Sequence, residues 1–143
     1  MTRRVLALLA SLGAGLGCAA LADPLGRGSA LEDAQLRYTQ QVRWGNLDAA
    51  SEFVDPALRE EFLSQAPAFE AVRITDYEIG RIDWGEHRDS ATVRVTYRAY
   101  SLASLQEKRI DEEQHWVRPG SGNTWFVKPE LAGLLEPFPG IGR

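Results

Sequence analysis

The stretch Ser90-Ala-Thr-Val-Arg-Val-Thr-Tyr-Arg-Ala-Tyr100 decides the fold. Small and apolar side chains alternate in it with polar ones: Ala91, Val93, Val95, Tyr97 and Ala99 against Thr92, Arg94, Thr96, Arg98 and Tyr100. This period of two predicts a β-strand with one face on a core and the other in water.

Three further segments extend this strand into a sheet. Upstream, Val72–Ile79 alternates with a change of phase at Thr75-Asp76, which predicts a β-bulge. Downstream, Lys108–Val117 and Thr124–Lys128 are separated by the turn residues 119–123. With a turn at residues 85–89 between the first two strands, the order predicts a four-stranded antiparallel meander.

The sequence before Val72 has helical spacing. Ser29 and Glu32 match a capping box, and the helix that they would start runs to about Trp44 with an apolar stripe. The stripe consists of Leu31, Ala34 or Gln35, Tyr38 and Val42. Gly45 ends this helix, Asn46 caps a second one, and Asp55-Pro56 begins a third that stops at Ala66-Pro67. We therefore predict an α+β domain, with N-terminal helices packed on one face of a curved four-stranded antiparallel meander.

Turn positions also predict the cross-strand registers. Symmetric connections place Tyr77 opposite Tyr97, Tyr97 opposite Ile110, and Trp116 opposite Trp125. The inner face would then hold these apolar groups: Tyr77, Ile79, Val93, Val95, Tyr97, Ile110, Trp116, Trp125 and Val127. By the same parity, Glu112 and Gln114 are polar side chains on the inner face. On the outer face Arg94 would pair with Glu113, and Arg98 would lie diagonal to Asp111.

Composition limits the function. The 143 residues fit one domain, and 16 basic against 20 acidic residues give a formal net charge of -4, which argues against a nucleic-acid partner. A single cysteine excludes a disulfide framework within the chain, and with two histidines it makes a structural zinc site implausible. We expect neither a metal nor a cofactor.

Residues 1–22 have the pattern of an export signal. Arg3 and Arg4 precede an uncharged run, Val5–Gly17, which is too short to span a bilayer. Two cleavage sites compete: a loose lipobox ending at Cys18, which would then carry lipid, or a small-x-small site ending at Ala22. Both readings predict a bacterial cell-envelope protein, either an outer-membrane lipoprotein or a soluble periplasmic one. We expect residues 23–30 to be a linker, 31–130 the domain, and 131–143 a tail that packs back on it.

The helix–helix step Arg43-Trp44-Gly45-Asn46-Leu47-Asp48-Ala49-Ala50 and the late strand Thr124-Trp125-Phe126-Val127 resemble the nuclear transport factor 2-like superfamily, with its cystatin-like cone. The resemblance covers about residues 31–130. It departs from the pattern in one respect, since many members have a strand between the early helices and none is found before Val72. Members range from isomerases and dehydratases to envelope proteins, so the resemblance implies a pocket rather than a chemistry.

The resemblance also suggests site residues. Ketosteroid isomerase of this superfamily uses an Asp base with a Tyr and a protonated Asp in an apolar pocket. Here Glu112 or Asp76 would be the base and Tyr77 or Tyr97 the oxyanion donor. The plainer interpretation, which we favour, makes the tyrosines core residues and Asp76 a bulge residue. It also places Glu112 on the outer face, through an error of one residue in the register. Four aromatic side chains would line or plug the pocket: Tyr38, Trp44, Trp116 and Trp125.

Two functions follow. The leading one is a non-catalytic envelope module that assists another envelope protein or binds a small apolar ligand. It would bind no nucleic acid and would contact the membrane only through a lipid on Cys18. The module could also form a homodimer. The alternative is a small isomerase- or dehydratase-type enzyme acting on an apolar ligand. An open cavity with a desolvated carboxylate would favour the enzyme, and a cavity plugged by tryptophans would favour the accessory module.

Overall fold

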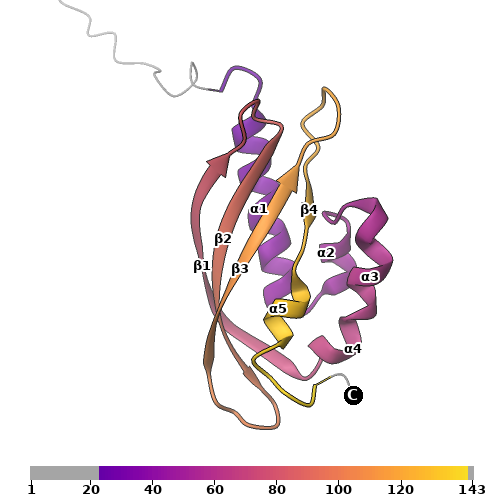
Figure 1. Ribbon diagram of the computed structural model, residues 1–143, viewed down its shortest axis with the longest axis vertical. Coiled ribbons are helices and arrows are strands. Elements are labelled where there is room, and N and C mark those ends of the chain that lie inside the picture. Colours follow the sequence, from indigo (N-terminus) through magenta and orange to yellow (C-terminus); the bar gives the residue numbers. More distant parts are fainter. Residues whose placement is uncertain (1–22, 142–143) are drawn as a thin grey trace, which may run out of the picture.

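A computed structural model describes residues 23–141 and shows an α+β fold with one open four-stranded sheet (Figure 1). This confirms the fold class. The elements in chain order are α1 (Arg27–Arg43), α2 (Leu47–Ser51), the 3-10 helix η1 (Pro56–Leu58), α3 (Arg59–Ser64), α4 (Ala66–Phe69), β1 (Val72–Trp84), β2 (Ser90–Ser101), β3 (Lys108–Val117), β4 (Phe126–Lys128) and α5 (Leu131–Leu135). The predicted export signal and Cys18 lie outside the described residues.

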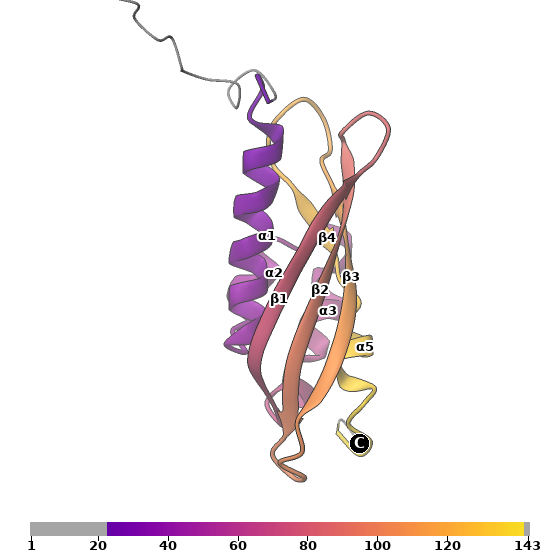
Figure 2. The same cartoon turned by 90° about the vertical axis from the view of Figure 1, so that its left-hand side faces the viewer.

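The sheet is an antiparallel meander in the order β1-β2-β3-β4. Figure 2 shows α1 and the shorter helices on one side of the sheet, with the other face uncovered by any described helix. Since only one face needs apolar side chains, β2 and β3 keep strict alternation, and every second residue of β2 from Ala91 to Ala99 is buried.

Two of the three predicted registers are confirmed. Tyr77 pairs with Tyr97, and Tyr97 pairs with Ile110. The third is wrong by two residues, because Trp116 faces Val127 instead of Trp125. A shift of two preserves the face of each side chain, so both tryptophans are still buried.

β1 contains the predicted irregularity between Ile74 and Asp76 and a second one between Ile79 and Ile82. The second bulge was not predicted. It lies after Ile79 and changes the phase again, so that Ile82 also packs against the core. Ile79 pairs with the inner-face residue Val95, as predicted, but it lies on the edge strand of the sheet and is 38% exposed.

The start of α1 corrects the predicted capping box and linker. The helix begins at Arg27, and the Asp23 carboxylate accepts hydrogen bonds from the backbone N–H groups of Arg27 at 2.9 Å and Gly28 at 2.8 Å. A third comes from Ser29 at 3.2 Å. Partial burial opposes ionisation of Asp23, but these bonds outweigh it and lower the pKa of the carboxyl. Asp23 therefore belongs to the folded domain as the cap of α1.

The middle helices are shorter than predicted. The Asn46 side chain accepts from the Ala49 N–H and Asp55 from the Ala57 N–H, which confirms both predicted caps. The third helix ends at Ser64, just before Ala66-Pro67, as predicted, but a further short helix that was not predicted, α4, begins at Ala66, because proline is permitted in the first turn of a helix. α5 packs back on the domain, as expected of the tail, and buries Leu131 and Leu134.

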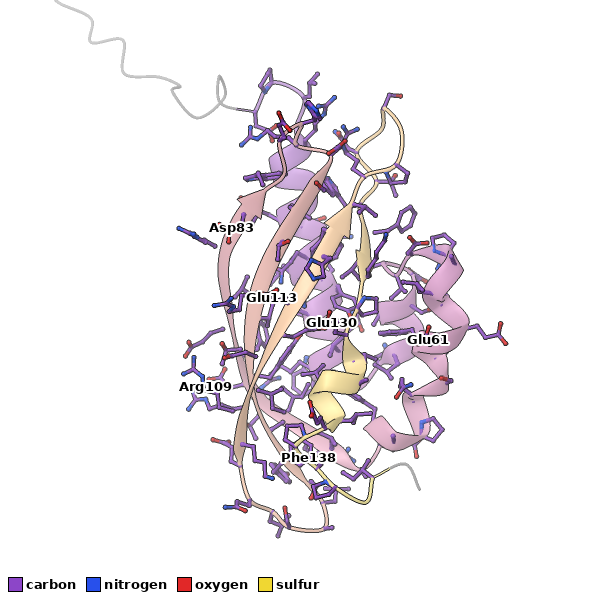
Figure 3. All side chains as sticks on the ribbon, in the orientation of Figure 1. Glu61, Asp83, Arg109, Glu113, Glu130 and Phe138 are labelled. Carbon is purple, nitrogen blue, oxygen red and sulfur yellow. The ribbon has the colours of Figure 1, made fainter. Side chains whose placement is uncertain are left out.

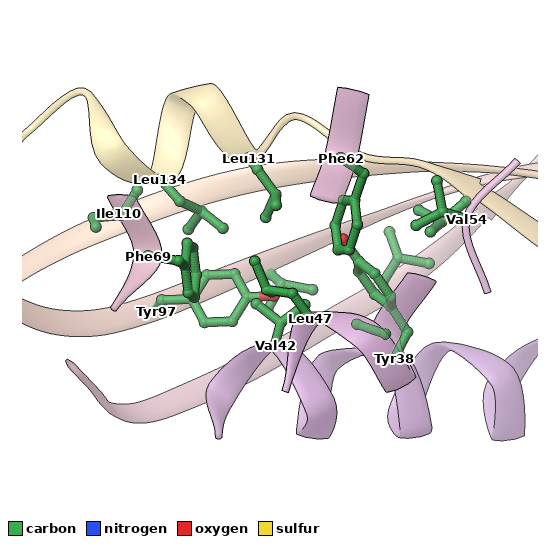
Figure 4. Packing of buried hydrophobic residues seen from close by; sticks show 14 of the residues in the cluster. Tyr38, Val42, Leu47, Val54, Phe62, Phe69, Tyr97, Ile110, Leu131 and Leu134 are labelled. Atoms are coloured by element: carbon green, nitrogen blue, oxygen red, sulfur yellow. The ribbon is translucent and has the colours of Figure 1, made fainter. Parts of the chain in front are cut away.

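The edge of β4 is covered by the chain between α2 and η1. Val54 forms a parallel bridge with Val127, and the backbone bonds Asp55 N–H to Val127 O (2.9 Å) and Val127 N–H to Phe53 O (2.8 Å) close it. A hydrophobic core lies between this chain, α1 and the sheet (Figure 4). No helix within residues 23–141 has the length and apolar character needed to cross a membrane.

Gly45 and Gly133 form a matched pair for testing backbone strain. A Cβ at either position would meet no atom within 4 Å, but Gly45 has a φ of +73°, whereas Gly133 lies in α5. Gly45→Ala should cost about 1–2 kcal/mol, because the left-handed region is unfavourable for a residue with a Cβ. Gly133→Ala should instead stabilise by about 0.5–1 kcal/mol. Urea denaturation measures both, and equal effects at the two positions would contradict the strain argument.

Candidate functional site

A cluster of polar side chains lies inside the core between α1, β2 and β3. β3 contributes Glu112 and Gln114, β2 contributes Tyr97, and α1 contributes Gln35 and Thr39. Glu112 is 3% exposed and Gln114 is fully buried, which confirms that both point to the inner face. The registers explain the cluster, since Val95 pairs with Glu112 and Val93 with Gln114.

Gln114 is the centre of the hydrogen bonds in this cluster. Its Nε2 lies 3.0 Å from Glu112 Oε2, 3.2 Å from Thr39 Oγ1 and 3.3 Å from the Tyr97 hydroxyl. Its Oε1 accepts from Gln35 Nε2 at 3.2 Å and from the Trp116 indole at 3.3 Å. A buried amide with this many partners holds α1 against the sheet in one alignment.

Glu112 is the buried ionisable group of the cluster. Its Oε2 accepts from the Tyr97 hydroxyl at 3.1 Å, while no side chain or backbone group of residues 23–141 meets the geometric criteria for a hydrogen bond to Oε1. Burial raises the pKa of Glu112, and the bonds from Gln114 and Tyr97 and the nearby backbone N–H of Glu130 offset this only in part. An unpaired oxygen on a buried carboxyl favours the protonated, neutral form.

Two tyrosines share this environment. Burial raises the pKa of Tyr97 well above its usual range, and the neighbouring Glu112 adds to the shift. Burial likewise raises the pKa of Tyr38, whose hydroxyl has no hydrogen-bond partner within residues 23–141. Both phenols are therefore neutral under ordinary conditions, and each is in principle a donor to an anion.

The structure brings together two of the four catalytic candidates, Glu112 and Tyr97. Asp76 lies at the first bulge of β1, half-exposed, and its carboxylate is ion-paired with Arg98 at 2.6 Å. It is therefore not a buried base. Tyr77 faces Tyr97 across the strands and is half-buried, but no hydrogen bond in residues 23–141 joins its hydroxyl to the cluster.

The aromatic candidates for pocket-lining residues separate into three environments. Tyr38 and Trp116 are fully buried and meet edge-to-face at 5.8 Å beside the polar cluster. Trp125 is buried near the start of α1, where it packs on Trp84 and donates to Arg27 O. Trp44 is 76% exposed, which corrects its assignment to the pocket. It lies two positions after Val42, on the opposite side of the helix from the buried stripe.

Access from solvent to Glu112 is closed. None of five surface cavities found in the described part of the chain is lined by Glu112, Tyr97 or Tyr38. A cavity of about 280 Å³ lies between α3 and α5, where Phe62 and Leu131 are lining residues. Phe62 packs on Tyr38 with ring centroids 6.3 Å apart in the core (Figure 4). Glu130, whose backbone N–H lies near the Glu112 carboxyl, also lines this cavity, but Glu112 itself is 3% exposed and is not among the lining residues.

Sequence reasoning missed the contribution of α1 to this cluster. Gln35 was one of two choices for its stripe position, and Thr39 was not considered. The available signal was the spacing of four residues between them, which places both on the face that meets Gln114.

The outer face is a surface of exposed charges (Figure 3). Arg94 and Glu113 form the predicted pair at 2.9 Å. The predicted diagonal contact of Arg98 with Asp111 does not form. Arg98 is ion-paired with Asp76 instead, and the Asp111 carboxylate accepts a hydrogen bond from the Thr96 hydroxyl at 2.6 Å. Such exposed pairs contribute little to stability.

The comparisons with known proteins give one structural match. No protein-family model matches the chain, and no curated protein matches it. The chain is similar in structure to a SEC-C motif containing protein from Rhodopseudomonas palustris, solved in solution, with a TM-score of 0.54 and 13% sequence identity over 74% of this chain and 87% of that one. At this identity the match shows a shared fold alone.

This finding overturns the resemblance to the nuclear transport factor 2-like superfamily, which none of the comparisons supports. The structure shows why the quoted residues were not specific. Gly45 takes a left-handed conformation after α1 and Asn46 caps α2, as in many helix–helix turns. Trp125 and Val127 are alternating core residues of an ordinary strand end.

Proposed function

We propose that this protein is a non-catalytic binding or accessory module of a bacterial cell envelope, exported by residues 1–22 and either anchored through lipid on Cys18 or released by cleavage after Ala22. The observation that carries the proposal is the closed core. Glu112, the best candidate for a catalytic base, lies behind packed aromatic side chains.

Catalysis by Glu112 would require a substrate atom within about 2.6–3.2 Å of its carboxyl oxygens. Oε2 is occupied by Tyr97 and Gln114, and no described cavity reaches Oε1. Trp116 and Tyr38 are fully buried and pack edge-to-face at 5.8 Å beside the cluster. This arrangement favours a structural role for the cluster over the enzyme alternative.

The position of Asp23 supports export. Its carboxylate caps α1, so cleavage before Cys18 or after Ala22 leaves every described element intact. After cleavage at either site the mature chain would carry a net charge of -6. That charge disfavours direct adsorption to anionic lipid, which leaves the lipid anchor as the means of membrane attachment.

The mass of the intact protein extracted from bacterial membranes tests this proposal. An N-terminus at Cys18 with the mass increment of a lipid supports the lipoprotein, and one at Asp23 supports the soluble periplasmic form. If Cys18 is acylated, Cys18→Ala should move most of the protein from the membrane to the soluble fraction, because the anchor supplies most of the membrane affinity. Ser29→Ala serves as the control and should leave the distribution unchanged. A mature protein that retains Met1 would overturn the proposal.

The dye 1-anilinonaphthalene-8-sulfonate separates the module from the enzyme alternative. A native protein with an open apolar cavity binds the dye, whereas a closed core does not. We expect Glu112→Gln to leave the dye fluorescence of the folded protein unchanged, because Glu112 is 3% exposed. A strong increase that Glu112→Gln alters would favour the enzyme.

A further inference from the structure

A groove at the C-terminal end of α1 combines an exposed aromatic side chain with two arginines. Its volume is about 480 Å³, and it lies between the end of α1, α4 and the beginning of β1. Trp44, Arg43 and Arg73 line it, and Phe69, Val72 and Ile74 supply its apolar part.

The two arginines are held in place without being neutralised. Arg43 Nη2 donates to Thr75 O at 2.8 Å, and Arg73 Nη1 donates to Glu70 O at 2.8 Å and to Val72 O at 2.9 Å. Within residues 23–141 neither guanidinium has a carboxylate within 4 Å, although Glu70 also lines the groove. Arg37, on the same helix, is instead paired with Asp33 at 3.1 Å. The groove therefore keeps a positive charge in a chain whose net charge is negative.

Trp44 is the most exposed large apolar side chain among the described residues. Arg43 lies over its ring at 4.4 Å, which restricts the indole while leaving 76% of the residue exposed. Leu102 and Leu105 add apolar surface at the same end of the sheet, where the Leu102 N–H donates to Ala71 O. Tryptophan and arginine are the residue types that contribute most to protein–protein binding.

We propose that this groove binds an acidic segment of a partner protein, with carboxylates on Arg43 and Arg73 and an apolar side chain against Trp44. The charge of the groove selects an anionic partner, and the indole selects one with an apolar group beside the charge. The proposal rests on the proposed function as a binding module, for which it names the surface and the partner's chemistry.

The geometry favours a protein segment over the membrane surface. α1 has 17 residues, so Trp44 is about 25 Å from the start of the helix, where any lipid tether enters the domain (Figure 1). A tethered domain can thus present Trp44 away from the bilayer to which its N-terminus is attached.

Selection from a random dodecapeptide display library tests the proposal, with the full exported protein as target. The library is selected in parallel on the wild type, Trp44→Ala, Arg73→Gln and the matched control Arg37→Ala. Circular dichroism confirms that each target is folded. We expect sequences rich in Asp and Glu around an apolar residue to be enriched on the wild type and the control.

A synthetic peptide of the enriched sequence should bind Trp44→Ala at least tenfold more weakly, Arg73→Gln several-fold more weakly and Arg37→Ala with unchanged affinity. Binding should also weaken as salt rises. Enrichment of no sequence, of basic sequences, or of sequences that bind Trp44→Ala equally well overturns the proposal. The proposal is also overturned if no peptide is selected and the protein sediments with phosphatidylglycerol vesicles in a way that requires Trp44, because the surface would then bind membrane rather than a protein segment. These outcomes are independent of the mass of the mature chain, which tests the proposed function.

Discussion

Trp116→Ala is expected to lower the free energy of unfolding by about 3–5 kcal/mol, the usual cost of truncating a large buried aromatic side chain. Trp116 is fully buried, packs edge-to-face on Tyr38 with ring centroids 5.8 Å apart, and donates its indole N–H to the side-chain oxygen of Gln114. The variant therefore leaves a cavity and removes one donor from the polar cluster. For a domain of this size the melting temperature should fall by about 10–20 °C.

Trp44→Ala is the matched control for this prediction. Trp44 is a tryptophan of the same chain with 76% of its surface exposed, so its loss should change the free energy of unfolding by no more than about 0.5 kcal/mol. Thermal and urea denaturation followed by circular dichroism measure both variants. A loss below about 1 kcal/mol for Trp116→Ala would show that Trp116 does not belong to the core.

Glu112→Gln is expected to change how stability depends on pH. Burial raises the pKa of Glu112 in the folded protein above its value of about 4.3 in the unfolded chain. The folded state then holds the proton more tightly, so the wild type loses stability as the pH rises from about 4.3 to the folded pKa. The slope contributed by this one group reaches about 1.4 kcal/mol per pH unit. Above the folded pKa the full penalty of the buried charge remains.

The glutamine variant carries no charge at any pH and should lack this contribution. The difference between variant and wild type should therefore increase in favour of the variant from about pH 4.3 upward, while Tyr97 and Gln114 keep an acceptor. Urea denaturation at a series of pH values measures the difference.

Glu113→Gln is the control, on the adjacent residue and the opposite face. The hydrogen bond and ion pair with Arg94 lower the pKa of Glu113 in the folded protein. The stability that Glu113 contributes is therefore fully present above its pKa in the unfolded chain, and it is lost as the pH falls through its pKa in the folded protein. The two variants should thus have pH dependences of opposite sign. A flat difference profile for Glu112→Gln would mean that Glu112 is not desolvated.

Glu112 could be placed from the sequence because strand parity is a local property. Once β2 and β3 are recognised, the pleat alone places Ile110, Glu112, Gln114 and Trp116 on one face. Its partners could not all be predicted in this way. Gln35 and Thr39 reach Gln114 from α1, roughly 75–79 residues away in the chain, and only the packing of the helix on the sheet sets that contact.

Positions at which two local rules compete were the ones predicted wrongly. Ile79 has the parity of an inner-face residue and pairs with Val95, but it lies on the edge strand β1 and stays 38% exposed. Trp44 has the size and apolarity of a core residue, but it follows the last turn of α1 on the side away from the stripe. Asp23 precedes Pro24 in a stretch that reads as a linker, but a turn through Gly26 at φ +64° brings its carboxylate onto the start of α1.

The sequence by itself determined the α+β class, the meander, the faces of β2 and β3, and the caps at Asn46 and Asp55, since each depends on steric and hydrogen-bonding preferences over a few residues. The tertiary structure alone decided three other features: the β3–β4 register, the closure of the core around Glu112, and the groove that leaves Trp44 exposed between Arg43 and Arg73. These depend on contacts between segments distant in the chain, whose energies are small individually and favour one arrangement only when the whole domain is packed.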